Sequence, residues 1–252
     1  MLVELFGMRF DTRPAAAVLD DAFAVPGAGP RLVVTANLDH VLNLSRTPAF
    51  RAAYASAAAR TLDGMPVVWL ARARMSREAR SPQGAQNVAR VTGHDLWRAL
   101  LDRTPTGPIF ILAPDREAGA GAERALTARG WGPVQSVVPP FGFEHDAAYG
   151  ATLAETIRRY GPAVLLIGVG APKSEIWVHQ QGAALGNPVA LCIGEALAVG
   201  AGLIARAPAA MQRAGLEWLW RFSLSPRRLF VRYFIRSWRF PLLAWRNPDL
   251  SK

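Results

Sequence analysis

The sequence predicts an α/β fold in which helices flank a parallel β-sheet. Four short apolar segments, 31–35, 108–113, 163–168 and 188–193, have the length and residue types of buried strands. Segments with helical spacing separate them, and this strand–helix alternation is typical of a parallel sheet. The chain has 252 residues and is 51% hydrophobic, so it can bury a sizeable core as one domain, with or without an appendage.

Composition excludes several classes of protein. Cys192 is the only cysteine, which excludes an internal disulfide and a cysteine-based metal site and indicates a reducing compartment. The N-terminus lacks the basic and then apolar pattern of a signal peptide. The chain contains no stretch of about twenty uncharged apolar residues, so no membrane-spanning helix is predicted.

The formal net charge is +10 and is concentrated in the tail. Residues 211–252 contain nine Lys or Arg and two Asp or Glu, a net charge of +7. A basic tail indicates an anionic partner, such as lipid headgroups, nucleic acid or a phosphorylated substrate.

The first half of the chain begins with a strand at Leu2–Phe6 and a helix at Thr12–Phe23, in which Pro14 is tolerated in the first turn. The next expected elements are a strand at Arg31–Thr35 and helices at Leu38–Leu44, at Pro48–Ala59 and from Asp63 to about Ala73. Arg74–Asn87 is polar and without periodicity, and is expected to be a surface loop.

The second half continues the alternation. Strands are expected at Pro108–Ala113, Val134–Val138, Ala163–Gly168 and Pro188–Ile193. Helices are expected from the Arg90–Leu96 segment to Arg103, at Glu117–Arg129 and Asp146–Tyr160, from Ser174 to about Leu185, and at Ala196–Gly200.

The segment Thr61–Trp69 contains the candidate catalytic base. Asp63 precedes Gly64 and an apolar run, so its carboxylate lies where a strand ends and a helix begins. Ligands bind at that edge in open parallel sheets. Thr35 and Asn37 follow another strand and suit hydrogen bonds to sugar or phosphate oxygens. The alternative for all three residues is capping of the following helix.

Two helix N-termini are candidate anion sites. Arg90 precedes a helix start that carries Thr92 and Gly93, and a guanidinium with free backbone N–H groups suits a diphosphate. The alternative is an exposed arginine beside a threonine cap. His94 and Asp95 are expected to be solvated residues of the first turn rather than metal ligands.

The second anion site follows the strand 163–168. Gly170 permits close backbone approach, Lys173 offers a cation, and Ser174 begins a helix, which suits a phosphate or a nucleotide. A tight strand–helix turn is the alternative. Lys173 holds the third position of Gly-x-Gly-x-x-Gly, which disfavours dinucleotide binding. The loop Pro139–Phe143 either contacts a flat ring of a ligand or forms a stiff turn packed on the core.

The tail is expected to form a basic amphipathic helix. It contains four of the eight tryptophans, and its apolar and arginine residues fall on separate helical stripes. Tryptophan with arginine is typical of an interfacial membrane element. The alternatives are a helix packed on the core and RNA binding, which the lack of a recognition motif disfavours.

Seven motifs, in order along nearly the whole chain, resemble the WecG/TagA/CpsF family of bacterial glycosyltransferases (glycosyltransferase family 26). They are Thr35–Asn37, Leu62–Trp69, Arg90–Leu96, Pro139–Phe143, Gly168–Trp177, Arg206–Pro208 and Met211–Arg221. Three departures concern donor recognition: Ser174 stands where the family often has Gln, Ala113-Pro114 where many members have Gly-Gly, and Ala198-Val199 where many have Phe-Asp.

The resemblance implies a Rossmann-like catalytic domain of the GT-E type over residues 1–207 and a membrane-associating helical appendage over residues 208–252. It implies inverting, metal-independent transfer from a UDP-sugar to a polyprenyl-diphosphate-linked sugar for exopolysaccharide or cell-surface polysaccharide. No cofactor and no nucleic acid are implied. The protein is expected to lie peripherally on an anionic membrane surface, at the cytoplasmic face of the inner membrane. The family's sugars include N-acetylmannosamine, its uronic acid and glucose, so the donor stays open, as does a homo-oligomer.

The resemblance also implies roles for single residues. Asp63 is implied as the general base, with Thr35 and Asn37 near the acceptor or donor sugar and Arg90 near the pyrophosphate. The other substrate-binding positions implied are Gly64, Thr92, Gly93, Gly142, Gly170, Lys173, Ser174, Glu175, Gly194, Arg206, Arg221, Arg227 and Arg228. The last three are the tail arginines implied to close over the diphosphate.

The chemistry of the residues is consistent with that reading. Inverting transfer needs one base, and the departing UDP needs a positive charge. No Asp-x-Asp occurs, so bound Mg²⁺ is not suggested. Two other classes stay open from the residues alone: a nucleotide-binding oxidoreductase and a non-catalytic basic adaptor for lipid or nucleic acid.

Overall fold

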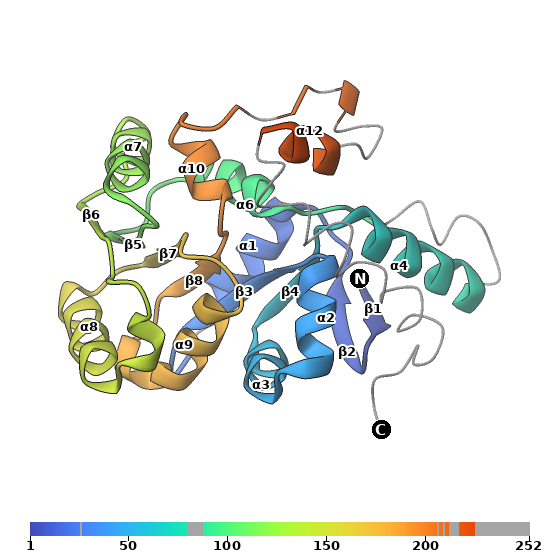
Figure 1. Cartoon of the computed structure of the whole chain (residues 1–252), viewed down its shortest axis with the longest axis horizontal. Helices are drawn as coiled ribbons and strands as arrows, with labels where there is room; N and C mark the ends of the chain where they lie inside the picture. The colour runs from blue at the N-terminus through green and yellow to red at the C-terminus, as the bar shows by residue number, and fades with distance from the viewer. Residues whose placement is uncertain (26, 80–87, 206, 209, 212–216, 225–252) are drawn as a thin grey trace.

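The computed structural model, shown in Figure 1, describes residues 1–25, 27–79, 88–205, 207–208, 210–211 and 217–224. The strands in this part are β1 (Leu2–Leu5), β2 (Met8–Asp11), β3 (Arg31–Ala36), β4 (Ala59–Leu62), β5 (Ile109–Leu112), β6 (Val134–Val137), β7 (Val164–Ile167) and β8 (Val189–Cys192). The helices are α1 (Ala15–Ala24), α2 (Leu38–Arg46), α3 (Pro48–Ser56), α4 (Met65–Glu78), α6 (Gly93–Leu101), α7 (Arg116–Thr127), α8 (Ala147–Tyr160), α9 (Lys173–Gln181), α10 (Ala196–Gly200) and α12 (Glu217–Leu224), with 3₁₀ turns η1 (Phe143–His145) and η2 (Gly182–Leu185).

The strands of the described residues form one sheet in the order β1-β2-β4-β3-β8-β7-β5-β6. Only β1 and β2 pair antiparallel, and the other neighbours are parallel. β4 lies on one side of β3, next to β2, and β5 and β6 lie at the opposite end of the sheet. The predicted α/β class is therefore confirmed, and the arrangement is Rossmann-like.

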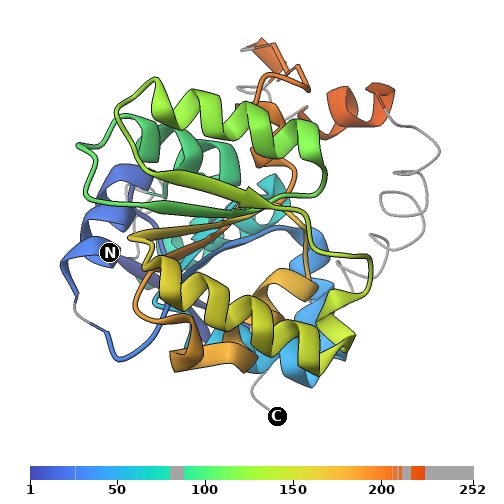
Figure 2. The ribbon, with the colours of Figure 1, turned by 90° about the vertical axis from the view of Figure 1, so that its left-hand side faces the viewer.

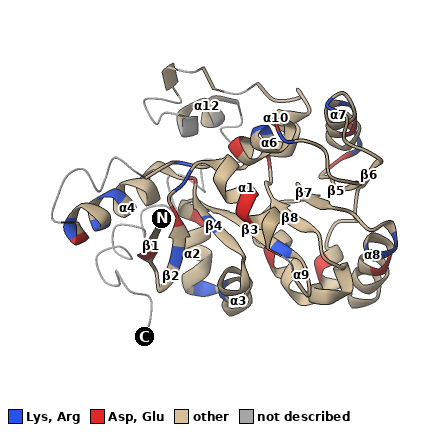
Figure 3. Cartoon of the chain, turned by 180° about the vertical axis from the view of Figure 1, so that it is seen from behind, with Lys and Arg blue, Asp and Glu red and all other residues tan. Residues whose placement is uncertain are grey.

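Side chains of the parallel strands alternate between two cores. Phe110 and Leu112 of β5 join the core that α2, α3, α4, α8 and α9 cover, whereas Ile109 and Ile111 join the core that α1, α6, α7 and α10 cover. Figure 2 shows α7 over one face of the sheet and α8 over the other. Because both faces of the central strands are buried, β5 and β7 are apolar throughout and contain no charged residue (Figure 3).

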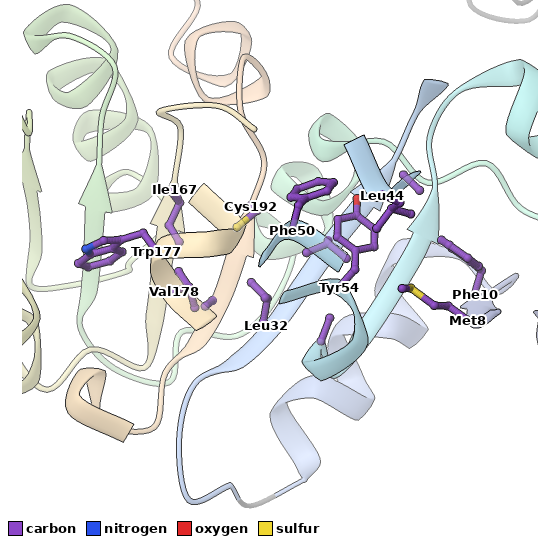
Figure 4. Packing of buried hydrophobic residues seen from close by; sticks show 14 of the residues in the cluster. Met8, Phe10, Leu32, Leu44, Phe50, Tyr54, Ile167, Trp177, Val178 and Cys192 are labelled. Atoms are coloured by element: carbon purple, nitrogen blue, oxygen red, sulfur yellow. The ribbon is translucent and has the colours of Figure 1, made fainter. Parts of the chain in front are cut away.

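The core that contains Phe110 and Leu112 lies beneath the segments that line the candidate site. Figure 4 shows Trp177 and Val178 of α9 beside Ile167 of β7, with Cys192 of β8 between them and the Phe50–Tyr54 pair of α3. The Phe50 and Tyr54 rings are 4.8 Å apart between centroids, and both are fully buried. Dense packing at this level fixes the ends of β7 and β8.

The sequence analysis missed β2. Phe6 and Gly7 have φ angles of 56° and 71°, which make a two-residue turn of the kind that joins antiparallel strands. Phe6 has this left-handed backbone although it is not a glycine. Its side chain is buried, with its ring centroid 6.4 Å from that of Phe10. A four-residue strand directly after such a turn carries too few residues to show a period of two.

Several expected element bounds are also corrected. The surface loop expected from Arg74 is wrong up to Glu78, because α4 continues that far with a 2.7 Å Arg74–Glu78 ion pair across one helical turn. The helix expected up to Ala59 ends at Ser56, since residues from Ala59 pair with β3. Helix α6 begins at Gly93, inside the Arg90–Leu96 segment that was expected to open it, and residues 80–87 lie outside the described residues.

Little of the tail falls within the described residues. The expected tail helix is described only as α12, whose Trp220 indole nitrogen donates a 3.0 Å hydrogen bond to the Ala205 carbonyl. Residues 225–252 lie outside the described part, so the predicted boundary at residue 207 stays a prediction. Of the helices described, none is long and apolar enough to cross a membrane.

The contact of α10 with α6 depends on Gly200 having no side chain. A Cβ atom at Gly200 would lie 2.5 Å from Cε2 and 2.6 Å from Nε1 of Trp97, which is buried. Gly200→Ala should therefore lower the free energy of unfolding by about 1–3 kcal/mol in urea denaturation.

Gly29→Ala is the matched control, because its Cβ would have no neighbour closer than 3.6 Å. It should change stability by less than about 0.5 kcal/mol. Equal losses in the two variants would contradict the proposed close approach of Gly200 and Trp97.

Candidate active site

A cleft of about 420 Å³ lies at the carboxyl ends of the central strands. Its walls come from the residues that follow β3, β4, β5, β7 and β8, together with the start of α6. Parallel strands end at one edge of a sheet, which is why segments far apart in sequence meet there. Eight of the residues predicted to form the site line this cleft together: Thr35, Asn37, Asp63, Gly93, Gly170, Ser174, Glu175 and Gly194.

Asp63 lies directly after β4 with its carboxylate at the cleft. Its backbone N–H donates to the Ala36 carbonyl at 2.9 Å, and its own carbonyl accepts from Arg90 Nε at 2.6 Å. Arg90 Nη2 also lies 3.5 Å from Asp63 Oδ1, and the two side chains are 20% and 15% exposed. Asp63 and Arg90, which come from two separate motifs, therefore form a direct ion pair.

The strand–helix turns after β3 and β4 approach each other closely. Asn37 caps α2, because its side-chain oxygen accepts from the His40 N–H at 3.2 Å. Gly64 is the N-cap of α4, and a Cβ there would lie 3.2 Å from Asn37 Cα. Asn37 thus caps the following helix, which was the alternative considered for it, and it also lines the cleft. Thr35 lines the cleft from within β3.

Side chains of the same segment cap the backbone N–H groups at the N-terminus of α6. Thr92 Oγ1 accepts from the Asp95 N–H at 3.1 Å, and Asp95 Oδ2 accepts from the Thr92 N–H at 3.0 Å, a reciprocal capping box. Asp95 thus pairs with Thr92. Gly93 does line the cleft, and a Cβ there would lie 2.7 Å from the Ile193 carbonyl oxygen. Gly93 therefore has a packing reason for lacking a side chain.

The turn between β7 and α9 forms the opposite wall. Gly170 has φ = 90°, and Ser174 Oγ donates back to its carbonyl at 2.9 Å. Lys173 and Gly142 are not among the residues lining the cleft. Lys173 Nζ instead lies 5.7 Å from the ring centroid of the fully exposed Phe141, so the Pro139–Phe143 loop stands beside the start of α9.

Glu175 is the most unusual residue of the cleft. It is 1% exposed, it occupies the first turn of α9, and its Oε2 has no hydrogen-bond partner. Burial raises the pKa of this carboxyl from 4.5 to about 7, against the effect of a hydrogen bond from its own backbone N–H. The nearby Tyr54 and Cys192 are also fully buried, and desolvation, reinforced by the Glu175 charge, raises the pKa of both.

Sequence reasoning missed several residues of the cleft, among them His40 and Asp115. His40 lines it and shares a 2.6 Å Nδ1–Oη hydrogen bond with Tyr54. Asp115 lines it and caps α7 by accepting from the Ala118 N–H at 2.8 Å. Asp115 could have been found from its place just after a predicted strand, but His40 has no local sequence signal.

The predicted arginines of the tail are not placed by the structure. Arg206, Arg227 and Arg228 lie outside the described residues, and Arg221 falls in α12 with its side chain undescribed. In the described ranges no cluster of three or more His, Cys, Asp or Glu has the arrangement of a metal site.

A comparison with protein families identifies the protein as a glycosyl transferase. The match runs over residues 3–251, essentially the whole chain. The protein belongs to the WecG/TagA/CpsF family of glycosyl transferases.

Glu175→Gln should change how stability depends on pH. The carboxyl ionises near 4.5 in an unfolded chain and near 7 in the folded one. The stability that the neutral carboxyl contributes is therefore present below about pH 4.5 and is lost as the pH rises through about 7. Between pH 5 and 8 the variant should gain up to roughly 3 kcal/mol relative to the wild type.

Urea denaturation at several pH values measures this difference. Glu117→Gln, an exposed first-turn carboxyl of α7, is the matched control and should show no such change. A variant-to-wild-type difference that stays constant with pH would mean that Glu175 ionises normally in the folded protein.

Proposed function

We propose that this protein is an inverting, metal-independent glycosyltransferase of the hexosyltransferase type. It moves a hexose or N-acetylhexosamine from a UDP-sugar to a polyprenyl-diphosphate-linked sugar in the synthesis of exopolysaccharide or another surface polysaccharide. The observation that carries the proposal is the Asp63 carboxylate, which opens into the same cleft as the Gly168–Ser174 turn and is held by Arg90. Family membership supports transfer over the oxidoreductase and adaptor alternatives.

Asp63 acts as the general base. It takes the proton from the acceptor hydroxyl as that oxygen attacks the anomeric carbon, and UDP leaves from the opposite face of the sugar, so the configuration inverts. Arg90 holds the base in place twice, once through the Asp63 backbone carbonyl and once through the carboxylate. Thr35 and Asn37, on the neighbouring strand end, hydrogen-bond the sugars.

The diphosphate binds at the start of α9. The Gly170 turn leads into this helix, whose N-cap Pro172 has no side-chain cap, so the positive end of the helix dipole faces the anion. The Ser174 N–H already donates to the Gly170 carbonyl at 3.2 Å, and the Glu175 N–H bonds its own carboxylate. The cleft also contains Asp39, Asp115 and Glu195. Positive charge for the departing UDP therefore has to come from the rim, and the family resemblance assigns it to Arg221, Arg227 and Arg228, with Arg90 near the pyrophosphate.

The acceptor explains the basic tail. A polyprenyl chain keeps the acceptor in the membrane, so the enzyme has to work at the bilayer surface. The net charge of +7 in residues 211–252 suits anionic headgroups. The protein is thus peripheral, at the cytoplasmic face of the inner membrane, where UDP-sugars are available.

Asp63→Asn tests the base directly. The amide keeps the size of the side chain but cannot accept the proton, so turnover should fall by about 10²- to 10⁴-fold. Turnover is measured as UDP released in the presence of a polyprenyl-diphosphate sugar, and UDP affinity should stay unchanged. Asp102→Asn, which neutralises an exposed carboxylate 3.3 Å from Arg129, should keep full activity. Normal turnover by Asp63→Asn would refute the assignment.

Removal of divalent metal tests the second part of the proposal. Because arginines and the positive end of a helix dipole supply the positive charge, excess EDTA should leave UDP release unchanged. A loss of turnover on chelation that added Mg²⁺ restores would show that a metal ion offsets the diphosphate instead.

A further inference from the structure

The loop between β6 and η1 presents a large apolar side chain to solvent beside the candidate active site. Phe141 is fully exposed, and its neighbours Val138 and Pro140 are exposed as well, so the tip of the loop is apolar. Phe143, two residues further on, is 2% exposed, and its ring centroid lies 5.8 Å from that of Trp177. One phenylalanine thus anchors the loop to the core, while the other is held away from it.

The backbone keeps Phe141 at the tip of the loop. The Phe143 N–H donates to the Pro140 carbonyl at 3.1 Å, which closes a four-residue turn with Phe141 and Gly142 at its centre. Gly142 has φ = 82°, a left-handed conformation that glycine adopts without strain, and the proline ring fixes φ at Pro140. The loop is therefore the stiff turn considered from the sequence. An exposed ring that is already held in place loses little conformational entropy when it binds.

Lys173 adds a positive charge to this apolar tip. Its Nζ lies 5.7 Å from the Phe141 ring centroid, and it forms no ion pair within the described residues. The carboxylates nearest in sequence do not oppose it directly, since Asp146 accepts from the Tyr149 N–H at 2.9 Å and the Glu144 side chain is 18% exposed. Phenylalanine together with lysine is typical of elements that lie at a membrane surface, where the ring enters the headgroup boundary and the cation faces lipid phosphate.

The loop lies on the side of the molecule where the cleft opens. It follows β6, which is parallel to β5 and β7, so it leaves the sheet at the same edge as the turns that line the cleft. Figure 2 shows the segment after β6 and helix α12 on the same side, toward which the β6 arrow points. A bilayer that meets the protein at α12 is therefore also on the side of Phe141.

We infer that the loop 138–142 is a second membrane contact, in which Phe141 enters the headgroup region and Lys173 faces the lipid phosphates. The inference rests on the proposed function, in which the enzyme works at a membrane to reach its lipid-linked acceptor. The basic tail attracts anionic lipid through charge, and salt screens that attraction. The burial of an apolar ring is not screened. The two contacts together hold the cleft in one orientation over the bilayer.

Phe141→Ser tests the contact in the full-length protein with vesicles of phosphatidylglycerol and phosphatidylethanolamine. Removal of the ring should weaken vesicle binding, measured by sedimentation, by about tenfold. The difference should persist in about 1 M KCl, where the Debye length is about 3 Å. Phe141→Trp should bind at least as tightly as the wild type, because tryptophan prefers the headgroup boundary. Equal binding by the wild type and Phe141→Ser overturns the inference, as does a difference that the salt abolishes.

Val25→Ser is the matched control. Val25 is an exposed apolar residue directly after α1, and its carbonyl accepts from Arg31 Nη1 at 3.2 Å. Arg31 begins β3, so Val25 lies at the amino end of that strand, away from the edge that carries the loop. Vesicle binding should be unchanged in this variant. A loss comparable to that of Phe141→Ser would mean that binding follows general surface hydrophobicity, and it would overturn the assignment to the loop.

A polarity-sensitive fluorophore reports the position of the loop directly. Cys192 is the only cysteine and is buried, so a thiol reagent labels the side chain introduced by Phe141→Cys or, as the control, by Val25→Cys. Addition of the vesicles should shift the emission of the label in the loop to shorter wavelength and leave that of the control label unchanged. Emission from the loop label that does not respond to vesicles contradicts insertion.

Enzyme assays separate this inference from the proposed function and from other partners of the loop. With a water-soluble, short-tailed acceptor and no vesicles, Phe141→Ser should keep the wild-type kcat/KM. A lower kcat/KM would assign Phe141 to the acceptor, and a changed oligomeric state in sedimentation velocity would assign it to a second copy of the chain, so either result overturns the membrane contact. Absence of transfer by the wild type to any polyprenyl-diphosphate sugar refutes the proposed function, whereas the vesicle measurements test the loop alone.

Discussion

The site depends on how the segment 88–92 is held along the end of β4. Val91 donates to the Leu62 carbonyl at 2.8 Å, and the buried Thr61 hydroxyl donates to the Val91 carbonyl at 3.0 Å. These bonds place Arg90 against Asp63, two residues beyond Thr61. The segment therefore lies beside the end of β4 and holds Asp63 from one side, while Ala36 of β3 accepts a hydrogen bond from the Asp63 backbone N–H. A carboxylate positioned from two sides loses little freedom when the substrate arrives.

Much of the fold could be predicted from the sequence because the parallel strands are buried on both faces. Such strands appear as continuous apolar runs, and each expected run has a strand at its place. The exceptions are informative. Residues 8–11 and 59–62 are short and carry Arg9 or Arg60, so their sheet pairing comes from neighbours rather than from their own pattern. Arg60 is stabilised by backbone carbonyls, including those of Arg9 and Ala55.

The candidate site was predictable to the extent that topology alone determines it. Polar residues that follow predicted strands, such as Asp63 and Asn37, had to meet at one edge. What the residue types could not show is how each group is used within the protein. Thr92 is occupied by its capping box, and Lys173 lies by Phe141 rather than in the cleft. The burial of Glu175 depends on packing against β8 and α3, which no local pattern reports.

The strand order has a consequence for biosynthesis. β8 is the last strand in the described chain, yet it lies in the middle of the sheet, between β3 and β7. A nascent chain that ends before residue 189 therefore holds two half-sheets with open edges and no contact through β8. The cleft draws walls from both halves, so it comes into existence only when the final strand is inserted. A truncated translation product would thus lack the site altogether, rather than retain a weakened form of it.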